Sequence, residues 1–215
     1  GALRGAPALR ELRLCDNPDL FTTRAPEAAL PRTFIESALP TRVPALHLDP
    51  DLQARHPVIV EALAAWHRFA GAGGVPCWQG FSPSAMPARV VPHLLVVQVV
   101  ATDPPRFRWR LIGTAIVKRL GRDSTGKGFE DLYQGAVYDH MTEAPLWVLA
   151  HLRPLRSEGS AAFAGKDFLT SENLFLPATS HPGGPVDRIL VVSVYEPPPG
   201  TQGSSPSSPS SSGSA

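Results

Sequence analysis

The stretch that decides the fold is PHLLVVQVVATDPPRFRWRLIGTAIVKRLGRDSTGKG, residues 92–128. Its first part, Leu94–Val100, is a nearly continuous aliphatic run, which is typical of a strand buried on both faces. An Asp-Pro-Pro turn interrupts the run, and residues 106–112 then alternate basic with bulky side chains. Because the side chains of a strand alternate between its two faces, the bulky residues share one face and the arginines the other. The short connection predicts an antiparallel hairpin.

Residues 114–120 predict a short helix directly after the hairpin, with Thr114 as its N-cap and Gly121 at its C-terminal end. The polar loop that follows contains Gly126, Lys127 and Gly128. It is not a phosphate-binding P-loop, because Gly128 stands where that motif needs Ser or Thr and because a helix precedes it. We interpret the loop as a candidate hinge.

An amphipathic helix is predicted upstream, over residues 57–70, where apolar residues recur at spacings of three and four. Pro57 suits a first helical turn, and a cluster of glycines from Gly71 stops the helix. Trp66 and Phe69 flank its apolar face. They are more typical of docking residues than of a cofactor site.

The second half of the chain alternates helical and strand patterns. Residues 129–152 carry apolar residues at helical spacing, interrupted by Pro145. Segments 160–169, 172–179 and 186–196 predict three strands. Two strands, then helices, then three strands is an α+β order. We therefore predict an α+β fold with a five-stranded antiparallel sheet and helices on one face, preceded by the amphipathic N-terminal helix.

The composition sets the domain organisation. The chain has 215 residues, a net charge of +1 and 24 prolines, many of them near its two ends. We predict a flexible or loosely packed extension over residues 1–50, a domain over 51–198 and a disordered Ser/Pro/Gly tail over 199–215. The alternative for the extension is a docking segment that folds on a partner.

Cysteine usage and hydropathy give a prediction of the compartment. Cys15 and Cys77 lie in dissimilar contexts, which favours free thiols in a reducing environment over a disulfide. No run reaches the ~18 apolar residues of a membrane span, and no signal-peptide pattern begins the chain. We expect a cytoplasmic protein without a membrane span. A targeting segment removed before Gly1 stays an open alternative.

Several short motifs occur in the order found in a family of small bacterial stand-alone PAS-like proteins, which the chain resembles over about residues 58–196. The motifs are PHLL at 92–95, FRWRLIGT at 107–114, LGRDSTGK at 120–127, ENLFLP at 172–177 and VDRIL at 186–190. The landmark residues are Trp66, Arg108, Arg110, Gly113, Thr114, Gly121, Arg122, Asp123 and Gly126. The sequence departs from the family at Cys77-Trp78-Gln79, where an arginine is common, so the contact of that arginine is in doubt.

The resemblance implies a non-catalytic sensory or regulatory module in bacterial signalling. PAS domains hold a small ligand between the sheet and the facing helices, or contact a partner through the outer sheet face and a flanking helix. In those terms the pocket wall comes from Leu95, Val97, Trp109, Leu111, Ile116, Leu120, Phe129, Leu132, Leu174, Leu176, Ile189 and Val191. The alternative is that these side chains simply fill the core.

The resemblance leaves the cofactor and the partner open. A covalent flavin of the light-sensing type would need a cysteine in the helical region, and haem would need an axial histidine. His140 and His151 are weak candidates for polar pocket or haem contacts. No metal site is predicted. The expected partner is a separate signalling protein or a second copy of the chain, docked through the 57–70 helix.

Two other functions have weaker support in the sequence. A small hydrolase could use Asp123, His140 or His151, but no nucleophile or metalloprotease motif accompanies them. A weak nucleic-acid surface could use the Arg106, Arg108 and Arg110 face. The low net charge and the lack of a neighbouring aromatic platform favour a solvated sheet face instead, so no nucleic-acid partner is expected.

Overall fold

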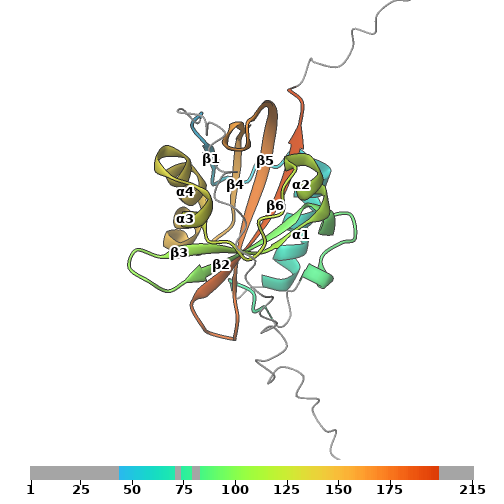
Figure 1. Ribbon diagram of the computed structural model, residues 1–215. Helices are drawn as coiled ribbons and strands as arrows, with labels where there is room; N and C mark the ends of the chain where they lie inside the picture. Colours follow the sequence, from blue (N-terminus) through green and yellow to red (C-terminus); the bar gives the residue numbers. More distant parts are fainter. Residues whose placement is uncertain (1–43, 71–73, 79–82, 199–215) are drawn as a thin grey trace, which may run out of the picture. The chain divides into compact units, whose positions relative to one another are not determined.

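The hairpin that the sequence predicts lies at one side of a larger sheet (Figure 1). In the computed structural model, β2 (Leu94–Val100) pairs antiparallel with β3 (Arg106–Ile112). β2 also pairs with β6 (Val186–Glu196), so it has a hydrogen-bonded neighbour on both sides, as its aliphatic run predicts. The structure describes residues 44–70, 74–78 and 83–198.

Within these described residues, six antiparallel strands form one sheet in the order β1-β4-β5-β6-β2-β3. The other strands are β1 (His47–Asp49), β4 (Leu155–Ala161) and β5 (Lys166–Thr179). The α+β antiparallel architecture is confirmed, with one strand more than the five predicted. The additional strand is β1, inside the segment assigned to the N-terminal extension. Its three residues are too few to show a period in the sequence.

The turn between β4 and β5 lies elsewhere than predicted. The sequence predicts one strand over residues 160–169, whereas the chain turns there through a short 3₁₀ helix, Ala162–Ala164. Gly165 follows with φ +67°, a left-handed conformation that glycine adopts without a steric penalty. The apolar residues of this turn face the core, which is why they resemble part of a strand.

Helices cover both faces of the sheet (Figure 1). α2 (Thr114–Leu120), α3 (Phe129–Leu132) and α4 (Gly135–His151) lie against one face, here called the inner face. α1 (Pro57–Ala70) packs against β5 and β6 on the opposite, outer face. The sequence predicts helices on one face of the sheet. In the structure the amphipathic helix α1 covers the opposite face as well.

Two apolar cores result from this arrangement, because the central strands carry large apolar side chains on both faces. The inner core joins α2, α3 and α4 to the sheet, and Phe107, Phe129 and Ile189 are among its buried members. The outer core lies under α1 and includes Ile59, Trp66, Leu174, Leu176 and Val192. Short 3₁₀ helices at Pro83–Ala85 and Val91–His93 precede β2.

A buried ionic cluster fastens the start of the domain to the sheet. The Arg156 side chain on β4 is 2% exposed and donates hydrogen bonds to Asp49, Glu172 and Glu158. Glu172 also accepts the backbone N–H groups of the two residues before α1, Arg55 and His56, at 2.9 and 3.0 Å. β1, β4, β5 and the N-terminus of α1 therefore share one electrostatic anchor.

Some expectations fall on residues that the structure does not describe. Residues 1–43, Gly71 and the tail over 199–215 lie outside the described residues, as does Cys15. Cys77 is a free thiol. In the described part of the chain, no helix is long and apolar enough to cross a membrane.

Candidate functional site: a cavity on the inner face of the sheet

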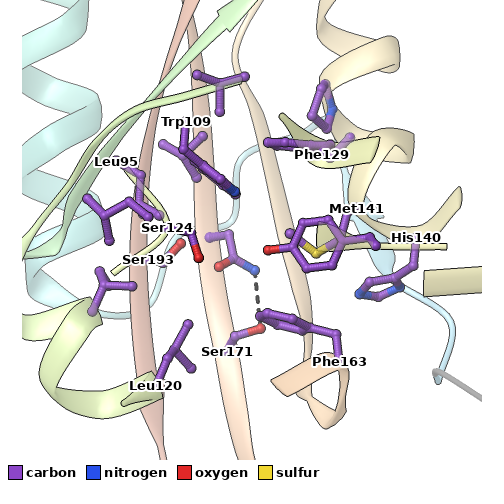
Figure 2. Close-up of a pocket in the computed structure, with 18 of the residues that line it drawn as sticks. Leu95, Trp109, Leu120, Ser124, Phe129, His140, Met141, Phe163, Ser171 and Ser193 are labelled. Atoms are coloured by element: carbon purple, nitrogen blue, oxygen red, sulfur yellow. Dashed lines mark hydrogen bonds between the residues drawn. The ribbon is translucent and has the colours of Figure 1, made fainter. Parts of the chain in front are cut away.

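The inner core is not completely filled. A cavity of about 80 Å³ remains between the sheet and α2, α3 and α4 (Figure 2). Strands β2, β3, β5 and β6 provide its floor, and α2, α4 and the loop after α2 provide its walls. Most of the lining is apolar, and several hydroxyl and amide groups interrupt it.

Seven of the twelve predicted pocket residues line this cavity. Six of them lie between residues 95 and 129 and the seventh is residue 191, and β2, β3, α2, α3 and β6 bring them together. These residues are Leu95, Val97, Trp109, Ile116, Leu120, Phe129 and Val191.

Leu111 does not line the cavity, because a β-bulge changes the alternation of β3. Val96 pairs with Leu111 and Val97 with Trp109, so Arg110 is an extra residue without a partner. The Leu111 side chain therefore lies on the outer face of the sheet, beside that of Val96. Ile112, opposite Leu95, takes the cavity position instead. Simple period-two alternation cannot reveal such a bulge.

Leu174 and Leu176 lie on the wrong face of β5 for the predicted role. Both are completely buried, but in the outer core beneath α1. Their neighbours Asn173 and Phe175 face the cavity. The sequence of β5 is apolar or small on both faces at this point, so the pattern could not distinguish the two.

Leu132 and Ile189 belong to the inner core but do not line the cavity. Ile189 is completely buried opposite Val97, and Leu132 packs at the edge of the same cluster. For these two residues, filling the core is the correct interpretation.

Of the two histidines predicted as polar pocket contacts, His140 lines the cavity and His151 does not, and the small polar side chains of the lining were not predicted. Ser124, Ser171, Asn173 and Ser193 all line the cavity and are at most 7% exposed. The Asn173 amide donates to the Ser171 hydroxyl at 3.2 Å (Figure 2). Small polar residues at alternate positions of two buried strands were the available signal, because a closely packed core would use apolar residues there.

Trp109 brings an unpartnered donor to the cavity. Its side chain is 6% exposed, and its indole N–H has no hydrogen-bond partner among the described residues. Figure 2 shows the nitrogen end of the ring pointing into the cavity. The N–H lies close to the Tyr133 hydroxyl, although the two groups are not in hydrogen-bonding geometry. This proximity favours a lower pKa of Tyr133, in opposition to the effect of burial. A buried donor without a partner carries a free-energy cost, so this group is a candidate ligand contact.

Tyr133 and Arg122 stand beside this donor. An Arg122 amino group donates to the Tyr133 oxygen at 3.4 Å, and the guanidinium lies 5.6 Å from the tyrosine ring centre. Burial raises the pKa of Tyr133, which outweighs the lowering by Arg122 and Trp109. The hydroxyl therefore keeps its proton at neutral pH. Arg122 is itself exposed, so it marks the solvent edge of the cavity.

The residues of the hydrolase alternative do not assemble into a catalytic group. His140 lines the cavity, and burial lowers its pKa against the opposing effect of Glu143, so it is neutral at pH 7. The Trp147 carbonyl oxygen lies 2.8 Å from His151 Nδ1 and accepts a hydrogen bond from it, and the His151 ring stacks on the Trp147 ring. Asp123 is hydrogen-bonded to Thr125. In the described residues, no hydrogen bond joins any of the three to another.

The arginine face of β3 points away from the cavity. Arg106, Arg108 and Arg110 are exposed, and Arg106 lies 3.7 Å from Glu130 in an ion pair. Among the described residues, no group of His, Cys, Asp and Glu side chains is arranged to hold a metal ion.

The landmark residues shape the backbone around the cavity. The Gly113 N–H donates to the Leu94 carbonyl, and Gly113 rather than the predicted Thr114 is the N-cap of α2. Gly121, with φ +82°, ends that helix as predicted. Gly126, with φ +84°, donates to the Trp109 carbonyl and ties the loop to β3. The turn that Asp123 forms with Thr125 leaves Ser124 buried in the cavity lining.

An antiparallel sheet that encloses a small mixed-polarity cavity under helices is the architecture expected of a PAS-like domain. Comparison with known families agrees. A family profile described as PAS domain matches residues 54–192, more than half of the chain. The chain belongs to the PAS domain family. No curated protein and no solved structure matches it.

Proposed function

We propose that the chain is a non-catalytic sensory or regulatory module in bacterial signalling, whose state depends on occupancy of the inner-face cavity by a small molecule. The observation that carries the proposal is a cavity of about 80 Å³ in an otherwise packed core. Protein interiors rarely leave such space, and buried polar groups around it need partners.

Two strands support a route from the cavity to the surface. Asn173 and Phe175 on β5 face the cavity, while Leu174 between them packs under α1. β6 repeats the arrangement, with Ser193 facing the cavity and Val192 facing α1. A displacement of either strand by a ligand therefore reaches α1 directly, because packed layers transmit small shifts.

The receiving partner is a separate signalling protein or a second copy of the chain, docked on the exposed side of α1. Val60 is 47% exposed there, on the side of the helix opposite its buried face. To test this, Val60→Glu is compared with Leu146→Glu, a change at a 41% exposed position of α4. We expect only Val60→Glu to shift the mass measured by light scattering or to abolish capture of a partner. Equal behaviour of the two variants would contradict docking through α1.

Ligand occupancy is tested by native mass spectrometry and an absorbance spectrum of freshly purified protein. The discriminating variant is Ala144→Leu, which puts an isobutyl group in place of a methyl on the cavity wall, where Ala144 is 1% exposed. Ala150→Leu makes the same change at an exposed position of α4. We expect a retained mass in the wild type and in Ala150→Leu, and its loss in Ala144→Leu. Identical spectra for all three proteins would overturn the proposal.

A further inference from the structure

The polar side chains that line the cavity can donate hydrogen bonds, and none of them carries a negative charge. Asp and Glu are both missing from the described residues that line it. Besides Trp109 and Arg122, the lining contains the hydroxyls of Tyr133 and Tyr195 and of several serines. Burial raises the pKa of both tyrosines, so both hydroxyls stay protonated and able to donate.

Three of these donors converge at one place. The Trp109 indole N–H has no hydrogen-bond partner in the segments that the structure describes and lies close to the Tyr133 hydroxyl, which in turn accepts a hydrogen bond from Arg122. Because the Tyr133 oxygen accepts from Arg122, its own proton is available to the cavity. An acceptor placed here would receive bonds from an indole, a phenol and, at the solvent edge, a guanidinium.

The positive charge at this place favours an ionised acceptor over a neutral one. A buried anion is stable only with hydrogen bonds and a countercharge, and Arg122 provides that charge. A carboxylate has the two oxygens and the planar shape that a guanidinium binds well.

The size of the cavity limits the rest of the molecule. An engineered protein cavity of about 150 Å³ binds benzene. A cavity of about 80 Å³ therefore suits a smaller molecule, with an alkyl group of only a few carbons. Leu95, Val97, Ile116 and Leu120 provide the apolar wall for such a group.

From these observations we infer that the cavity binds a short-chain carboxylate, with its carboxylate held by Trp109, Tyr133 and Arg122 and its alkyl group held among the aliphatic side chains. This inference rests on the proposed function, since it names the class of molecule that occupies the same cavity.

The test uses propionate as the probe and propionamide as a neutral molecule of the same shape, with sodium chloride matching the ionic strength. Protein labelled with ¹⁵N gives an indole N–H signal from each of its four tryptophans, and Trp109→Phe identifies the relevant signal. We expect propionate to move the Trp109 signal downfield in a saturable way. We expect propionamide to bind at least roughly tenfold more weakly, since a hydrogen bond to a charged group adds about 1.5–3 kcal/mol.

Two substitutions test the contacts, and each has a matched control. Trp109→Phe keeps an aromatic ring but removes the donor, and Arg122→Gln removes the charge at an exposed position. Each should weaken propionate binding roughly 10- to 100-fold, followed through backbone amide signals of the cavity residues because Trp109→Phe lacks the indole signal. Trp147→Phe and Arg119→Gln change the same residue types outside the cavity and should leave the affinity unchanged.

The outcomes separate this inference from the proposed function. Equal binding of propionate and propionamide, or full affinity in Arg122→Gln, would overturn the carboxylate assignment while leaving ligand occupancy intact. An unmoved Trp109 signal with propionate, together with a neutral molecule retained in the cavity, would do the same. If propionate leaves the signal unmoved and no mass is retained in native spectra, water fills the cavity and both proposals are wrong.

Discussion

Replacing Arg156 with methionine tests the buried ionic cluster that anchors the start of the domain. Methionine keeps an unbranched chain of similar length but removes the guanidinium. The substitution leaves the carboxylates of Asp49, Glu172 and Glu158 close together without their shared cation. Arg55 pairs with Glu158 at 3.4 Å, but it is 74% exposed and compensates little.

The expected loss follows from burial. Removing one partner of a buried ion pair destabilises a protein by about 3–5 kcal/mol. The side chains of Arg156, Asp49 and Glu172 are 2, 10 and 14% exposed, whereas that of Glu158 is 36% exposed and partly solvated. We therefore expect the lower end of the range, about 3 kcal/mol at pH 7. Arg55→Met, the control, should cost less than about 1 kcal/mol.

The free energy of unfolding is measured in urea at pH 7 and again near pH 4. Protonation of the crowded carboxylates relieves their repulsion in Arg156→Met, so its deficit relative to wild type should shrink at the lower pH. Equal losses for Arg156→Met and Arg55→Met at pH 7 would refute the reasoning, because the cluster would then act as a solvated surface network.

Three further predictions concern stability. Gly113→Ala should lower the free energy of unfolding by about 3 kcal/mol, because its Cβ would lie 2.3 Å from the Pro92 carbonyl oxygen. Gly183→Ala, in open space at φ +72°, should lower it by about 1–2 kcal/mol, and thermal unfolding of the two variants tests the difference. Trp66→Phe leaves the Pro177 carbonyl without the indole donor at 3.0 Å, which should cost about 1–3 kcal/mol in urea. Acid titration of the wild type tests Asp49 and Glu172, whose pKa values are lowered because hydrogen bonds, chiefly from backbone N–H groups and Arg156, outweigh burial. Their stabilisation should be complete above about pH 4.5 and fall as the pH drops below their unfolded pKa values, so stability that is flat between pH 5 and 3 would contradict it.

The local elements of this protein could be predicted because their signals are local. The bounds of α1, β2, β3, α2 and β6 agree with the predicted ranges. A helix shows itself by apolar spacing, and a central strand by an aliphatic run between turn residues. The order of these elements, with the motifs around Gly113 and Gly121, was also sufficient to indicate the PAS family.

The cavity could be predicted only in part, because the face of a strand depends on its partners. Leu95 and Val97 were assigned correctly to the lining, since they lie two residues apart on one face of β2 and Val97 pairs with the bulky Trp109 of β3. Leu174 was assigned to the wrong face. β5 is buried on both sides at this point, so its alternating pattern does not show which face lies toward the cavity. The bulge at Arg110 reversed the assignment of Leu111 for a similar reason: one extra residue changes the face of every residue beyond it.

What the sequence by itself determined is the set of elements, their order and the family, all of which depend on neighbours along the chain. Only the tertiary structure decided which side chains face the cavity, that Arg156 is buried among three carboxylates, and that the Trp109 N–H has no partner within the described part of the chain. These properties depend on contacts between segments far apart in sequence. A hydrogen-bond donor is unpartnered only with respect to everything packed around it, and no local pattern contains that information.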